Sequence, residues 1–148
     1  MKNKLAFHTT FALLFLTFSA FSQVEKVIYQ SVNIPDSTEQ FHFDIADPHE
    51  IISWQGNQIM IETTARFDGG TTEILKILIE EGRYVLKMDN KFPLTIIQPV
   101  TFPRTGVKRN SVVCNETIFY RIYVPEEFLK KGEDDFAKNI EPITASRN

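Results

Sequence analysis

A two-residue alternation of apolar and polar side chains constrains this chain most, because only an extended strand places every second side chain on one face. In the stretch QIMIETTARF, Ile59, Ile61 and Phe67 share one face, while Met60 and Glu62 lie on the other. The stretches EQFHFDI and RYVLKM repeat the alternation. The pattern predicts a mainly β fold whose strands each bury one face.

One segment has a helical period instead. Leu75 and Leu78 recur at helical spacing in TTEILKILIEEG, and a threonine of the preceding pair can cap the start. Gly82 suits the left-handed position that ends many helices. The sequence therefore predicts an antiparallel sheet or sandwich, or a short solenoid-like stack of hairpins, with one α-helix at about residues 72–81.

The stretch IISWQGNQIMIE reads as two apolar runs around a polar turn at Gly56-Asn57. Two such runs joined by a short glycine-containing turn predict a β-hairpin. We expect Trp54, Ile59 and Ile61 to share its core face. In the alternative interpretation, Trp54 is a binding residue.

The beginning of the chain has the pattern of a secretory signal peptide. A positively charged start, an apolar run and small residues before the cleavage position predict a cleaved signal peptide at residues 1–22. The next residue is Gln23 rather than Cys, which excludes the bacterial lipoprotein route. We expect a periplasmic, outer-membrane-associated or extracellular protein with no membrane span after cleavage. Residues 23–128 should form one β-rich domain, and residues 129–148 a flexible or partner-docking tail.

The charge balance argues against nucleic acid as a partner. The net charge is −3, whereas binding to phosphates requires clustered Lys and Arg. The basic residues Arg104, Lys108 and Arg109 lie in one predicted loop and, with Trp54, are the candidate binding residues. Cys114 is the only cysteine, so no internal disulfide can form, and we expect it to be a small buried residue.

The sequence carries no recognisable catalytic motif. It lacks the G-x-S-x-G turn of hydrolases and the G-x-x-x-x-G-K phosphate loop, so we predict no catalytic residue and no cofactor. His42, Asp44 and His49 fall within eight residues and offer imidazole and carboxylate groups, the ligands that transition metals bind. Their spacing matches no established metal motif.

Two short segments resemble a known group of proteins. Ile52–Glu62 is similar to the W-x-G-N-x-I-x-V-E hairpin of secreted, adhesin-like bacterial β-strand-repeat proteins of unknown function. Ile122–Pro125 resembles the I-Y-V-P strand end that closes such units. The resemblance spans about residues 24–128 and implies a β-rich secreted domain of stacked hairpins. It implies no catalytic residues.

Together these features predict a non-enzymatic, secreted cell-envelope protein that works by binding or assembly. Its expected partner is an envelope protein or a glycan. The alternative hypothesis is a small periplasmic metal-binding protein or enzyme that uses His42, Asp44 and His49.

Overall fold

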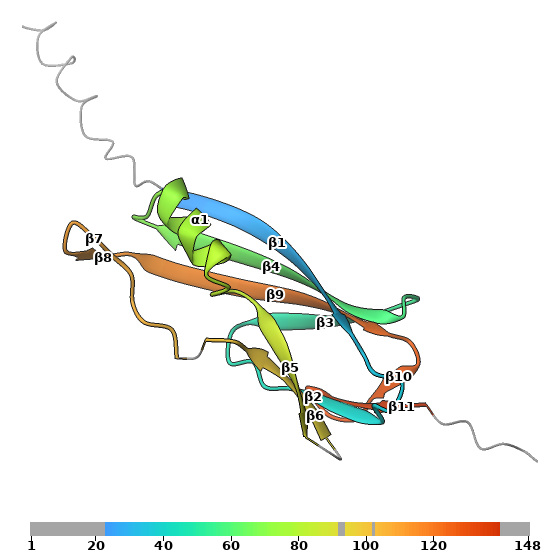
Figure 1. Ribbon diagram of the computed structural model, residues 1–148. Coiled ribbons are helices and arrows are strands. Elements are labelled where there is room, and N and C mark those ends of the chain that lie inside the picture. The colour runs from blue at the N-terminus through green and yellow to red at the C-terminus, as the bar shows by residue number, and fades with distance from the viewer. Residues whose placement is uncertain (1–22, 92–93, 102, 140–148) are drawn as a thin grey trace, which may run out of the picture.

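Two β-sheets and one short helix account for most of the residues that this computed structural model describes, which are 23–91, 94–101 and 103–139 (Figure 1). The predicted signal peptide at 1–22 and the end of the predicted tail at 140–148 lie outside the described residues. Sheet A has the order β1 (Gln23–Asn33), β4 (Gln58–Asp68), β9 (Asn115–Pro125), β3 (His49–Trp54). Sheet B has the order β10 (Phe128–Lys130), β11 (Asp135–Lys138), β2 (Gln40–Phe43), β6 (Leu94–Pro99), β5 (Leu86–Lys91). A ribbon pairs β7 (Lys108–Arg109) with β8 (Val112–Val113).

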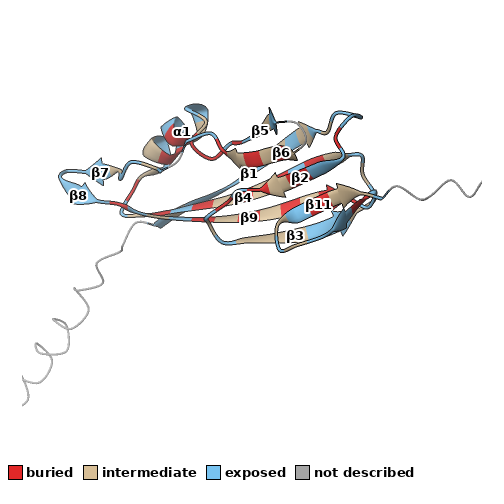
Figure 2. Cartoon of the chain, turned by 90° about the horizontal axis from the view of Figure 1, so that it is seen from below, coloured by how far each residue is buried: buried red, intermediate tan, exposed pale blue. Residues whose placement is uncertain are grey.

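The two sheets enclose a common core, which makes the fold a sandwich rather than a solenoid-like stack. Ile59, Ile61 and Phe67 of β4 join Phe41 and Phe43 of β2 in one hydrophobic cluster. Figure 2 shows buried positions on strands of both sheets. The prediction of a mainly β fold is confirmed, and the face predicted for β4 is the buried one.

The helix α1 (Thr72–Glu80) confirms the predicted change of period. The hydroxyl of Thr71 accepts a hydrogen bond from the backbone N–H of Ile74, which caps the first turn. Leu75 and Leu78 are buried in the common core. Gly82 follows the helix with a φ of 74°, a conformation that glycine adopts without steric cost.

The predicted hairpin between β3 and β4 is wrong. Strand β9 lies between them, parallel to β3 and antiparallel to β4. The turn at Gly56-Asn57 therefore joins two strands that have no direct backbone pairing with each other. The local pattern predicts the strands and the turn, but it does not show that β9 pairs with both β3 and β4 and so separates them.

The predicted boundary at residue 128 is also wrong. Strand β11 inserts between β10 and β2 in sheet B, so the domain continues at least to Lys138. The Phe136 ring stacks on Phe41 with centroids 5.3 Å apart and an interplanar angle of 13°. Burial of one aromatic side chain thus ties part of the predicted tail to the core.

Side-chain contacts join the two sheets at their edges. The Gln30 amide on β1 donates to the carbonyl of Leu86 at 2.5 Å and accepts from its N–H at 3.0 Å, which satisfies both backbone groups of a β5 residue. At the other edge, His49 on β3 contacts Asp134 before β11. No helix among the described residues is long and apolar enough to cross a bilayer.

Candidate functional site

The face of sheet A that points away from the core carries exposed and half-buried side chains, both charged and aromatic. Strand alternation places these side chains opposite the buried ones, and strand pairing aligns them in rows. One row runs Ser31, Met60, Tyr123, Ile52, and the next runs Tyr29, Glu62, Arg121, Glu50. We call these eight residues, together with Trp54 beside Ile52, the outer face of sheet A.

A chain of charges crosses the centre of this face. Arg121 donates from Nε to Glu50 and from Nη1 to Glu62 Oε1 at 3.0 Å, so one guanidinium joins strands β3, β9 and β4. The hydrogen bond to Glu50, followed by the charge of that carboxylate, raises the pKa of Arg121. Two carboxylates surround one cation, which leaves the row with a net negative charge.

Aromatic and apolar side chains flank the charges. Trp54 meets Tyr123 edge to face at 6.4 Å between ring centroids, and the indole N–H donates to the Gln58 carbonyl at 3.0 Å. Tyr29 is 72% exposed, and with Met60 and Tyr123 it lines a shallow cavity of about 310 Å³. The outer face is therefore amphipathic and partly preformed by internal contacts.

Trp54 lies on this outer face and not in the core, contrary to the prediction that grouped it with Ile59 and Ile61. It is half-buried against Tyr123, whereas Ile59 and Ile61 are fully buried on the opposite side of the sheet. That prediction required β3 and β4 to form one hairpin with a shared core face, whereas both strands pair with β9. Because β3 pairs only with β9, its register with β9 decides which of its side chains face the core.

A buried polar cluster lies between the helix end and strand β9. Arg83 donates to both Glu116 carboxylate oxygens at 2.8–3.3 Å and to the Thr105 carbonyl at 2.7 Å. The Tyr84 hydroxyl donates to Glu116 at 2.7 Å. Burial opposes ionisation of Glu116, but the hydrogen bonds from Arg83 and Tyr84 outweigh it and lower the pKa of that carboxyl. Burial and the Glu116 contact raise the pKa of Tyr84.

Arg104 belongs to a second buried polar group rather than to a basic surface. Its guanidinium donates to both carboxylate oxygens of Asp47 at 2.8–3.1 Å and to the Tyr120 hydroxyl at 2.8 Å. Burial raises the pKa of Tyr120 to about 12. Lys108 and Arg109 are exposed on β7. The structure therefore separates Arg104 from the two residues predicted to share its binding role.

No spacing in the sequence signals these two polar groups. Arg83, Glu116, Asp47 and Arg104 come from four separate segments that only the tertiary fold brings together. The row around Arg121 is hidden for a different reason: β9 carries bulky residues on both faces, a pattern typical of a strand that is covered on both sides. The charged residue Arg121 in the middle of β9 indicates that one face of this strand is open to solvent.

The predicted metal site is not formed. His42 Nδ1 lies 2.9 Å from Asp135, and His49 Nε2 lies 2.9 Å from Asp134, so each imidazole has its own carboxylate partner. Asp44 is exposed. Within the described ranges, no group of three His, Cys, Asp or Glu side chains could hold a metal ion. Cys114 is buried, as predicted.

Searches against protein families, curated proteins and solved structures found no match to this chain. The resemblance to adhesin-like proteins therefore stays a prediction.

Proposed function

We propose that this chain is a secreted, non-enzymatic binding module of the cell envelope, and that its partner is a protein that covers the outer face of sheet A. The observation that carries the proposal is the composition of this face. Tyr29, Trp54, Tyr123, Met60 and Arg121 are of the residue types that protein interfaces concentrate.

The geometry favours a protein over a glycan as the partner. The cavity beside Tyr29 holds about 310 Å³, which suits one inserted apolar side chain of a partner. Arg121 already donates from Nε to Glu50 and from Nη1 to Glu62, so fewer of its N–H groups remain for the hydroxyl groups of a glycan. A partner with an apolar anchor and a nearby cation would complement the remaining negative charge.

A site-specific photo-crosslinker tests the proposal. It replaces Ser31, an exposed residue whose register partner is Met60, in one variant, and it replaces Lys87, an exposed residue of β5, in the control. Crosslinking is carried out in cells that produce the protein naturally. We expect one discrete protein adduct from position 31 that position 87 does not give.

Competition then assigns the adduct to this face. Excess purified protein should suppress the adduct, whereas the Tyr29→Ser variant should do so at least tenfold less well. Tyr29 is largely exposed, so this substitution should leave the fold intact. Identical adducts from positions 31 and 87, or equal competition by Tyr29→Ser, would refute the proposal. An adduct with a glycan would assign the face to the other class of partner.

A further inference from the structure

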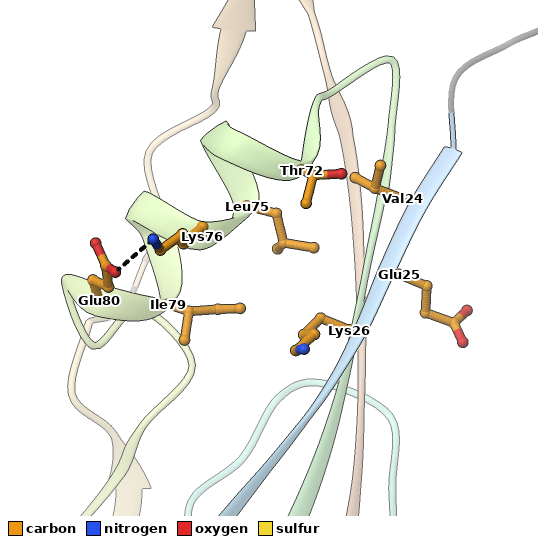
Figure 3. Close-up of a pocket in the computed structure, with 8 residues that line it drawn as sticks. All are labelled: Val24, Glu25, Lys26, Thr72, Leu75, Lys76, Ile79 and Glu80. Atoms are coloured by element: carbon orange, nitrogen blue, oxygen red, sulfur yellow. Dashed lines mark ion pairs between the residues drawn. The ribbon is translucent and has the colours of Figure 1, made fainter.

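A groove between α1 and the beginning of β1 is separate from the outer face of sheet A. Its volume is about 540 Å³, which lies within the range of small-molecule pockets in proteins. Val24 of β1 lies near Leu75 at one end of the groove, Ile79 of α1 lies across from Lys26 further along, and the lining is mainly apolar (Figure 3). We call it the α1–β1 groove.

The length of the groove fits an extended chain. Helix α1 has nine residues, which at 1.5 Å per residue gives about 14 Å. Leu75 and Ile79 lie one helical turn apart, so they form a continuous apolar strip along the helix. Val24 provides the opposite wall. An apolar strip along a helix of this length can hold a single extended hydrocarbon chain.

The charges at the groove favour an anion. Lys76 is already paired with Glu80 at 3.7 Å, and Glu25 points away from the helix (Figure 3). Lys26 is directed towards α1, and among the described residues its ammonium has no carboxylate within 4.0 Å. One uncompensated cation thus lies beside an apolar strip.

The position of Lys26 has a structural explanation as well. Strand β1 forms an edge of sheet A, and an inward-pointing charge on an edge strand discourages pairing with another chain. That role requires the charge of Lys26 but not the apolar groove beside it. The two roles therefore predict different results when the groove is filled.

We infer that the α1–β1 groove binds a single-chain amphiphile with an anionic headgroup, such as a fatty acid or a lysophospholipid. The hydrocarbon chain lies along Val24, Leu75 and Ile79, and the carboxylate or phosphate lies next to the ammonium of Lys26. The inference does not depend on the function proposed for the outer face of sheet A.

Calorimetric titration with decanoate, below its micelle concentration, tests the inference. We expect one saturable site, with affinity rising by up to about fourfold for each CH₂ added between octanoate and dodecanoate. Decyltrimethylammonium has the same chain and the opposite charge, and it should bind at least tenfold more weakly. The affinities of decanoate and of an anionic decanoyl lysophospholipid are then compared, and the tighter binder identifies the carboxylate or the phosphate as the preferred headgroup.

Variants localise the binding. Ile79→Trp fills the groove and should abolish decanoate binding, whereas Ile77→Trp alters an exposed position of the same helix and should not. Lys26→Gln should weaken decanoate several-fold and leave decanol binding unchanged. In the unsubstituted protein, decanoate should shift the methyl NMR signals of Val24 and Ile79 but not that of Ile77, a readout that does not require any variant to fold.

Three results would each overturn the inference. They are non-saturable binding with many sites, equal affinity for the anion and the cation, and decanoate binding that survives Ile79→Trp in a folded protein. Self-association of Lys26→Gln with unchanged decanoate affinity would assign Lys26 to edge protection alone.

Discussion

At the scale of single residues, Glu116 contributes most to the interior polar network. Its carboxylate accepts hydrogen bonds from Arg83, which follows α1, and from the buried hydroxyl of Tyr84. The side chains of Arg83 and Glu116 are only 9% and 15% exposed. A buried guanidinium is tolerated only while an ionised partner compensates it.

We therefore expect Glu116→Gln to lower the free energy of unfolding by about 3–5 kcal/mol, the usual cost of removing one member of a buried ion pair. Urea denaturation with an unchanged m-value measures it. Glu80→Gln breaks the exposed Lys76–Glu80 pair and should change stability by less than about 1 kcal/mol. Equal changes in the free energy of unfolding for the two variants would mean that the buried pair stabilises the fold no more than the exposed pair does.

His49 is a second residue whose charge matters to the fold. Its Nδ1 meets the Asp47 carbonyl and its Nε2 meets the Asp134 carboxylate, both at 2.9 Å, and both groups accept hydrogen bonds. Only the doubly protonated ring donates to both. Burial lowers the pKa of His49, but the hydrogen bonds to Asp134 and Asp47, with the charges of Asp134 and Glu133, outweigh it and raise that pKa.

The sign of the pH effect follows from that direction. Because the pKa of His49 is higher in the folded state, its stabilisation is complete below the unfolded value of about 6.5 and is lost as pH rises through the folded value. Urea midpoints between about pH 6 and pH 8 should fall more steeply with pH in the natural protein than in His49→Gln. His42→Gln is the matched control and should keep the steeper dependence. Parallel pH profiles for the natural protein and His49→Gln would contradict this.

At the scale of elements, the turn between β3 and β4 shows what local sequence can and cannot predict. The alternation in β4 and the glycine-containing turn were readable, because both depend on neighbouring residues. The pairing partner of β3 was not, because β9 lies more than sixty residues further along the chain. Local patterns carry no information on which distant strand completes a sheet.

The structure gives Gly56 in that turn a steric role. A Cβ at this position would lie 2.1 Å from the indole ring of Trp54, which its hydrogen bond to Gln58 and its contact with Tyr123 hold in place. Its φ is not in the left-handed region, so the requirement for glycine comes from packing rather than from backbone conformation.

Gly56→Ala should therefore cost about 1–3 kcal/mol, as overpacking does elsewhere. In the Trp54→Ala background the same change should cost almost nothing, because the clashing ring is gone. A double-mutant cycle by thermal denaturation measures this coupling. Gly106→Ala, with no atom within 4 Å of the added Cβ, is the control and should be neutral or slightly stabilising. Full additivity of the two changes at residues 54 and 56 would show that the indole does not lie over Gly56.

At the scale of the whole molecule, the chain order and the spatial order of strands differ strongly. Two parallel pairs, β3 with β9 and β2 with β6, join distant segments. The sequence therefore predicted the fold class and the helix but not the topology. The same limit hid the candidate site, since the outer face of sheet A exists only once β1, β4, β9 and β3 lie side by side.

The end of the described chain provides the sharpest test of this topology. Polar composition predicted a flexible or partner-docking tail from residue 129, yet β11 pairs with β2 and buries Phe136 against Phe41. If this arrangement stabilises the fold, Phe136→Ala should lower the free energy of unfolding by about 3–5 kcal/mol, as for other buried aromatic residues. Leu129→Ala, at a more exposed position of β10, should lower it by less than about 1 kcal/mol.

Removal of the strand extends the same test. A chain that ends at Lys130 loses β11, which leaves the edge of β2 unpaired and Phe41 without its stacking partner. We expect it to unfold at a markedly lower urea concentration than the full chain, or to aggregate. A tail that only docks a partner would behave differently, because Phe136→Ala and the shortened chain would then keep the stability of the natural protein and lose only the partner. Chemical denaturation of the isolated protein separates the two cases, since no partner is present.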